Sequence, residues 1–162
     1  MNPLLAIAAV SLLVSATFFL VMGYQLRSLK PNVVLLQLTF TEEAFRRVLF
    51  LWGPEGVNKF NSHFPLDYGF LTSYAIFGAS LGTWISGHTE SCVASSVLPW
   101  LLPTAALFDA TEDQFHQRQV VEVAGSFPRV SFLAAGLAAS AKWLLLLAFW
   151  PCAALVWSSH AA

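Results

Sequence analysis

Four side chains that can bind protons or metal ions recur on one face of a predicted helix. The stretch over residues 98–117 starts as an apolar run and then places, at relative positions 0, 3, 4 and 7, the residues Asp109, Glu112, Asp113 and His116. On an α-helix of 3.6 residues per turn, these offsets put all four side chains on one stripe. Three carboxyl groups and an imidazole on one face of an apolar helix predict a polar site.

Three interpretations of this stripe are open. Glu112 and Asp113 can mark the point where the helix leaves a membrane, with His116 as an interfacial histidine. Crowded carboxyls can instead handle protons or ions, in which case the candidate catalytic residues are Asp109, Asp113 and His116. A divalent metal is the third alternative, because Asp113-x-x-His116 has the spacing of the Glu-x-x-His motif in di-iron bundles. Its candidate ligands are Asp67, Glu112, Asp113 and His116.

Lys142 is the residue that costs most to bury. It lies about twelve residues into a predicted membrane span, near the midplane, where inserting a lysine costs roughly 2.5–3.5 kcal/mol. In the preceding span, Asp109 falls within about one helical turn of the same depth. We therefore predict a structural ion pair between Asp109 and Lys142.

The composition predicts an integral membrane protein with a single membrane domain over residues 1–162. The chain is 57% hydrophobic and only 10% charged, whereas ordinary globular domains carry about 25% charged residues. Its net charge of −1 offers no basic surface for nucleic acid. No CxxC motif and no glycine-rich phosphate loop occurs in the sequence.

Four apolar stretches are long enough to cross a membrane core of roughly 30 Å. They predict an all-α bundle of four transmembrane helices over residues 3–24, 65–85, 92–117 and 130–157. The first stretch lacks the basic start and the cleavage site of a signal peptide, so we expect it to stay in the protein.

A short amphipathic helix is predicted over residues 41–52, between the first two spans. Thr41 is a good N-cap, and a Gly-Pro pair after the segment should end the helix. Two interpretations fit it equally well. The helix can lie in the plane of the membrane surface, with Arg46, Arg47 and Trp52 as membrane-surface residues, or it can pack as a cap over the end of the bundle.

The basic residues indicate an orientation. All lysines and arginines except Lys142 fall on the side where the first span ends: Arg27, Lys30, Arg46, Arg47, Lys59, Arg118 and Arg129. The positive-inside rule makes this side cytoplasmic and puts both termini on the non-cytoplasmic side of a plasma or inner membrane.

The same rule places the acidic stripe in the cytoplasmic half of the membrane. Asp67 and Tyr68, at the start of the second span, fall at the same level. If the second and third spans are antiparallel neighbours, these two residues line one pocket with Asp109, Asp113 and His116. Such a pocket, surrounded by basic residues, could hold a lipid headgroup through a bound cation.

Two functions from different classes follow from these patterns. The leading expectation is a non-catalytic accessory or scaffold component that assembles with lipid or with other membrane subunits, as a homo-oligomer or within a larger complex. Small-residue helix faces favour it. The alternative is a membrane-embedded enzyme or an ion- or proton-handling protein, which would use the acidic and histidine pocket at the cytoplasmic leaflet.

Overall fold

The computed structural model describes residues 2–88, 92–121 and 128–160. Its elements are α1 (Pro3–Leu26), α2 (Val33–Gln37), α3 (Glu42–Ser86), α4 (Cys92–Val121) and α5 (Arg129–His160). The structure is 90% helical, and the part of the chain that it describes contains no strand. The all-α prediction is confirmed. Both predicted links between the later helices fall partly outside the described residues.

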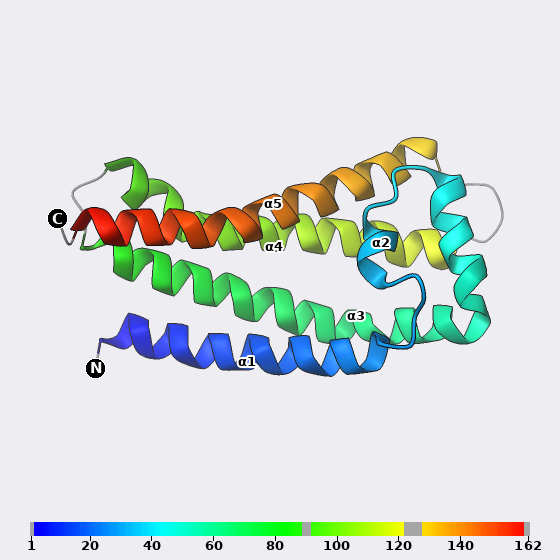
Figure 1. Ribbon diagram of the computed structural model, residues 1–162, viewed down its shortest axis with the longest axis horizontal. Coiled ribbons are helices and arrows are strands. Elements are labelled where there is room, and N and C mark those ends of the chain that lie inside the picture. Colours follow the sequence, from blue (N-terminus) through cyan, green and yellow to red (C-terminus); the bar gives the residue numbers. More distant parts are fainter. Residues whose placement is uncertain (1, 89–91, 122–127, 161–162) are drawn as a thin grey trace.

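The four long helices lie side by side in an elongated bundle (Figure 1). α1 packs on α3, α3 on α4, and α4 on α5. Both ends of the chain lie at one end of the bundle, while α2 and the first turns of α3 lie across the other end (Figure 1). Helices that follow one another in sequence are therefore neighbours, as short connections favour.

Two of the helices are long and apolar enough to cross a membrane. They are α1 and the part of α5 over Arg129–Ser158. α3 and α4 do not pass the same test of length and apolarity, so the predicted four-span bundle is not confirmed. The polar residues that both helices turn toward the interior lower their average apolarity.

α3 joins two elements that the sequence predicted separately. Its first turn begins as expected, with the Thr41 hydroxyl accepting a hydrogen bond from the backbone N–H of Ala44. The helical ladder is interrupted at Gly53, whose φ of 62° is a conformation that favours glycine. The helix then resumes through residues 54–64, where we had expected a connection, because Pro54 fits the first turn of a new helical segment.

The apolar face of the first part of α3 packs against the protein. Phe45, Val48 and Trp52 are all buried. The indole N–H of Trp52 donates a 2.7 Å hydrogen bond to the carbonyl of Pro31, and its ring lies 5.3 Å from that of Phe60. This segment therefore uses its apolar face, Trp52 included, as a cap over the bundle. A contact of Trp52 with a membrane surface stays a prediction.

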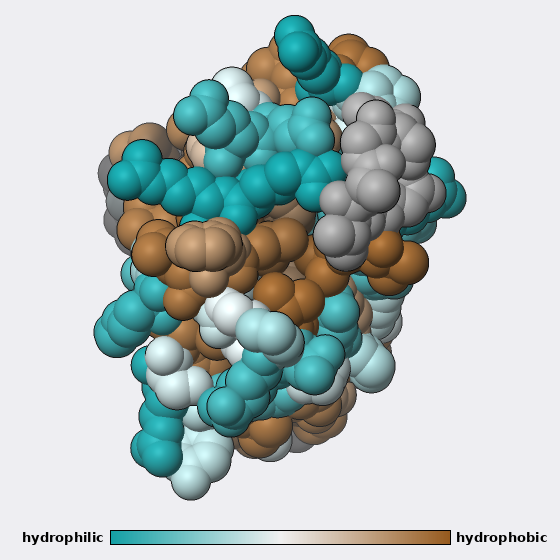
Figure 2. All heavy atoms as spheres, turned by 90° about the vertical axis from the view of Figure 1, so that its right-hand side faces the viewer, coloured by the Kyte–Doolittle hydropathy of each residue, from teal (hydrophilic) through white to brown (hydrophobic). Residues whose placement is uncertain are grey.

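The two arginines of this cap lie off its packed face. Arg46 forms a 2.7 Å ion pair with Glu42, and Arg47 is exposed beside the exposed side chains of Phe50 and Leu51. Figure 2 views this end of the molecule and shows hydrophilic residues with hydrophobic ones between them. A contact of Arg46 and Arg47 with a membrane surface stays a prediction.

The buried apolar residues form two clusters. One lies along the bundle and includes Leu71 of α3, Ala105 of α4 and Phe149 of α5. The other lies beneath the cap and includes Phe60 and Phe132. Buried polar residues occupy the positions between these clusters on all three helices.

α3 and α4 approach closely at two glycines of α3. A Cβ atom built on Gly78 would lie 2.3 Å from Cβ of Leu102, and one built on Gly82 would lie 2.7 Å from Cα of Pro99. Small residues at these positions, four apart on α3, therefore let the two backbones come together.

Replacing Gly82 by alanine should destabilise the protein by about 1–3 kcal/mol, the usual cost of overpacking a well-packed contact. The atoms that an added Cβ would meet belong to the backbone of α4, which cannot shift as easily as the end of a flexible side chain. The matched control is Gly23→Ala in α1, where an added Cβ meets no atom within 4 Å and where alanine favours the helix. Thermal unfolding in detergent micelles measures both variants. Equal unfolding midpoints for the two would contradict the close α3–α4 approach.

Candidate functional site

The polar stripe of α4 faces the interior of the bundle. Its four side chains are no more than 3% exposed: Asp109, Glu112, Asp113 and His116. The helical period puts them on one face, and α3 and α5 cover that face. Such burial speaks against the interpretation in which these residues mark the point where a helix leaves the membrane.

Lys142 of α5 lies against this stripe. Its ammonium is 2.5 Å from Oδ1 of Asp109 and 2.7 Å from Oε2 of Glu112. The hydroxyl of Tyr74, on α3, donates a 3.1 Å hydrogen bond to the other oxygen of Asp109. The structure thus brings the predicted pair together and adds Glu112 as a second partner, because residues three apart on a helix lie on the same face.

Glu112 also contacts His116, one turn further along α4. Its Oε1 lies 3.3 Å from Nδ1 of the imidazole. Glu112 therefore lies between the ammonium of Lys142 and the imidazole of His116. The His116 ring stacks on Phe45 of the cap at 5.5 Å, and its Nε2 is buried without a hydrogen-bond partner.

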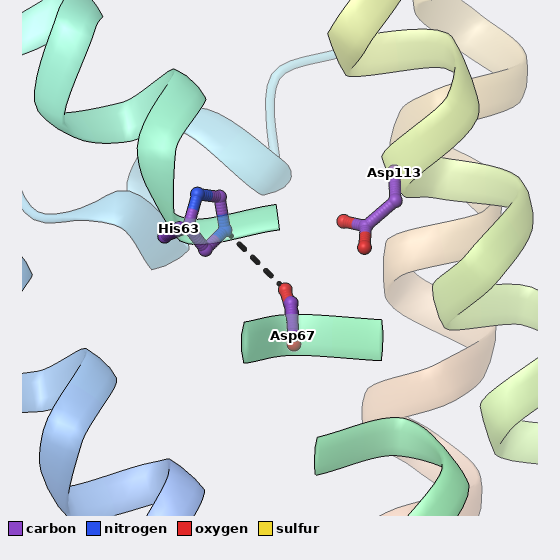
Figure 3. A group of neighbouring side chains, drawn as sticks. All are labelled: His63, Asp67 and Asp113. Carbon is purple, nitrogen blue, oxygen red and sulfur yellow. Dashed lines mark ion pairs between the residues drawn. The ribbon is translucent and has the colours of Figure 1, made fainter. Parts of the chain in front are cut away.

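A second group joins α3 to α4. His63, Asp67 and Asp113 are all buried, and each offers one ligand atom within 4.8 Å of the others. Figure 3 shows the carboxylate of Asp113 directed toward the two α3 side chains. Sequence reasoning did not include His63 in the site, because residues 54–64 were expected to form a connection. The sequence feature that could have identified His63 is its four-residue spacing from Asp67, which puts the two residues on one face of a helix.

The hydrogen bonding of His63 fixes which of its nitrogens faces the carboxylates. Nδ1 bonds to the backbone carbonyl of Phe60. A carbonyl oxygen only accepts, so Nδ1 carries the hydrogen, and the lone pair of a neutral imidazole is then on Nε2. Nε2 lies 3.3 Å from Oδ2 of Asp67, and Oδ2 of Asp113 is buried without a partner. Three acceptor atoms thus face one another and need a proton or a cation between them.

The whole cluster carries more acid than base. Its carboxyl groups are those of Asp67, Asp109, Glu112 and Asp113, and its one ammonium is that of Lys142. Buried ionised groups must be paired, or they take up protons or coordinate a metal. Two imidazoles can offset the excess only by becoming charged themselves. The site is therefore built to hold additional positive charge.

A cavity of about 290 Å³ reaches this cluster from the side. His63, Asp67, Asp109 and Lys142 contribute charged or ionisable groups to its wall, and most of the other lining residues are apolar ones of α1, α2, α3 and α5. Gln37 of α2 also lines it, with a buried side-chain oxygen that has no hydrogen-bond partner. A small molecule can thus reach the charged groups without opening the bundle.

The comparisons with known proteins provide no relative for this chain. No protein-family model matches it, no curated protein matches it, and no solved structure matches it. The chemistry of the site is therefore the basis on which a function can be assigned.

Replacing Lys142 by methionine should destabilise the protein by about 3–5 kcal/mol, because it leaves two buried carboxylates without their counter-charge. The double variant Asp109→Asn, Lys142→Met should recover part of that loss, since it removes one of those carboxylates. The free energy of unfolding in detergent, measured for both single variants and the double variant, gives the interaction energy. Strictly additive effects would show that the two groups do not stabilise each other.

Proposed function

We propose that this chain is an integral membrane protein that binds a divalent cation inside its helix bundle and depends on that cation for an enzymatic or ion-handling activity. The observation that carries the proposal is the group of three ligand atoms on His63, Asp67 and Asp113, which are buried within 4.8 Å of one another, with Oδ2 of Asp113 lacking a hydrogen-bond partner. A cation at this point would satisfy all three at once.

The types of ligand support a catalytic metal site rather than a structural one in which protein fills every coordination position. One imidazole and two carboxylates are a set used by zinc and by other divalent first-row metals, and a three-ligand site leaves a coordination position for water or substrate. Ligand atoms about 2.0–2.2 Å from a tetrahedral metal lie roughly 3.4 Å apart. Small rotations of the two carboxylates would bring the atoms from their present spacing to that value.

The hydrogen bond on the far side of the His63 ring also suits a metal ligand. The Nδ1 hydrogen bond of His63 to a backbone carbonyl fixes the ring orientation, as outer hydrogen bonds do for metal-bound histidines. Glu112 and His116, which the sequence suggested as metal ligands, contact each other instead, and Glu112 also contacts Lys142. We therefore assign the cation to His63, Asp67 and Asp113 and leave Glu112 and His116 as neighbouring charged groups.

The proposal includes membrane crossing by all four long helices. α4 keeps charged side chains inside and exposes large apolar ones, such as Trp100 and Leu107. This distribution is the reverse of that on a helix facing water. The distribution of basic residues supports an orientation in which the cap end, and with it the site, lies toward the cytoplasm.

A non-catalytic accessory or scaffold protein is the second candidate. It is favoured by the outer surface of α1, where large apolar side chains such as Leu13, Phe19 and Leu20 are exposed. A neighbouring membrane subunit could cover these apolar side chains in place of lipid. In that case the buried charges would fix the helix arrangement and bind nothing.

Metal analysis on protein purified in mild detergent, combined with native mass spectrometry, separates the two candidates. We expect about one divalent ion per chain, lost when Asp113 is changed to asparagine or His63 to glutamine. Both changes remove a ligand with little change in volume. The matched control is Glu42→Gln, which removes a carboxylate from the cap. A metal-free particle of fixed stoichiometry would overturn the cation proposal and favour the scaffold.

A further inference from the structure

The two outer helices of the bundle leave a groove between them. α1 packs on α3 and α5 packs on α4, while α1 and α5 hardly touch each other. The polar-walled cavity described above lies at one end of this space, and a second, apolar cavity of about 210 Å³ continues it along the bundle. Phe19, Phe70 and Leu146 line both cavities. We call the continuous space the α1–α5 groove.

The groove changes from polar to apolar along its length. Its polar end reaches the charged groups of Asp67, Asp109 and Lys142. Its other end is walled by side chains such as Leu12, Phe77 and Trp150. The two cavities together fall within the range of about 300–1,000 Å³ that is usual for small-ligand sites. A ligand that fills the groove must itself be polar at one end and apolar at the other.

The direction and length of the groove match a lipid of one leaflet. Its polar end lies beside the last turns of α1, next to the exposed Arg27, at the end of the bundle that carries the basic residues. From Arg27 to Leu12 the groove follows α1 for about 22 Å, at 1.5 Å per residue. That length is about half of the ~40–45 Å thickness of a bilayer with its headgroup regions, which is the depth of one leaflet.

We infer that the α1–α5 groove binds one anionic phospholipid, with an acyl chain along the apolar part and the phosphate near the proposed cation. The inference rests on the proposed function for its choice of headgroup, because carboxylates without a cation would repel a phosphate. With a cation bound to His63, Asp67 and Asp113, the phosphate has a positive partner at that end, and Arg27 supplies a second one at the mouth. A phospholipid is then the ligand, or the substrate, of the site.

Gly23 offers a way to block the groove without disturbing the helix packing. It lines the polar cavity, and a Cβ built on it meets no atom within 4 Å. A Gly23→Phe variant therefore adds a ring at the wall of the cavity, on a position whose Cβ has no contact to disturb. The matched control is Ala9→Phe, an equally large addition at an exposed position of α1 that lines neither cavity.

The test is native mass spectrometry of protein equilibrated in mixed micelles of phosphatidylglycerol and phosphatidylcholine in equal amounts. We expect the wild-type protein and Ala9→Phe to retain one phosphatidylglycerol per chain. We expect Gly23→Phe to retain at least tenfold less while keeping its metal. Asp113→Asn should lose both the metal and the preference for phosphatidylglycerol.

Each other outcome overturns the inference in a distinguishable way. A wild-type protein with metal but without bound lipid would exclude the groove site and leave the proposed function standing. Equal retention of the two lipids would exclude the preference for an anionic headgroup and with it the inferred ligand. Retention of lipid by Gly23→Phe would place the lipid elsewhere on the bundle. A metal-free wild-type protein would remove the proposed function itself, whatever lipid it carries.

Discussion

The arrangement of the helices depends on the buried ammonium of Lys142. A lysine in an apolar interior needs a counter-charge, and both of its partners, Asp109 and Glu112, are on the neighbouring helix. One charge thus fixes the rotation of α4 relative to α5. Once α4 is turned this way, Asp113 and His116 must also face inward, because the helical period ties their direction to that of Asp109. α3 then covers them, and Tyr74 completes the hydrogen bonding of Asp109.

This constraint also explains why the bundle is open on one side. α4 needs neighbours on both sides of its polar stripe, and α3 and α5 fill those places. α1 carries only apolar, serine and threonine side chains over most of its length, so no buried charge draws it toward α5. It packs on α3 alone, where Ser15 and Ser73 share a 2.8 Å hydrogen bond. The groove between α1 and α5 follows from this difference in polarity.

The sequence predicted what is local and missed what depends on distant contacts. The stripe from Asp109 to His116 was visible because a fixed helical period relates its members. The partner of Lys142 was predictable because few acidic residues lie at the same depth of the predicted spans as Lys142. His63 was missed because its segment looked like a connection, and it becomes helical where Pro54 restarts the ladder after Gly53. Nothing local in the sequence distinguishes a cap over a bundle from a helix on a membrane, since both need the same amphipathic pattern.

The position of the cap gives it a part in the site. It covers the cluster with Phe45, which stacks on His116, and its continuation beyond Gly53 supplies His63. A helix bound to the membrane surface could move without changing the interior of the bundle. This helix cannot, because its apolar face covers the charged cluster. The cap shields the carboxylates from water, which strengthens their attraction for a cation. The cavity beside α1 is then the route by which a ligand reaches the charges, between the two outer helices of the bundle.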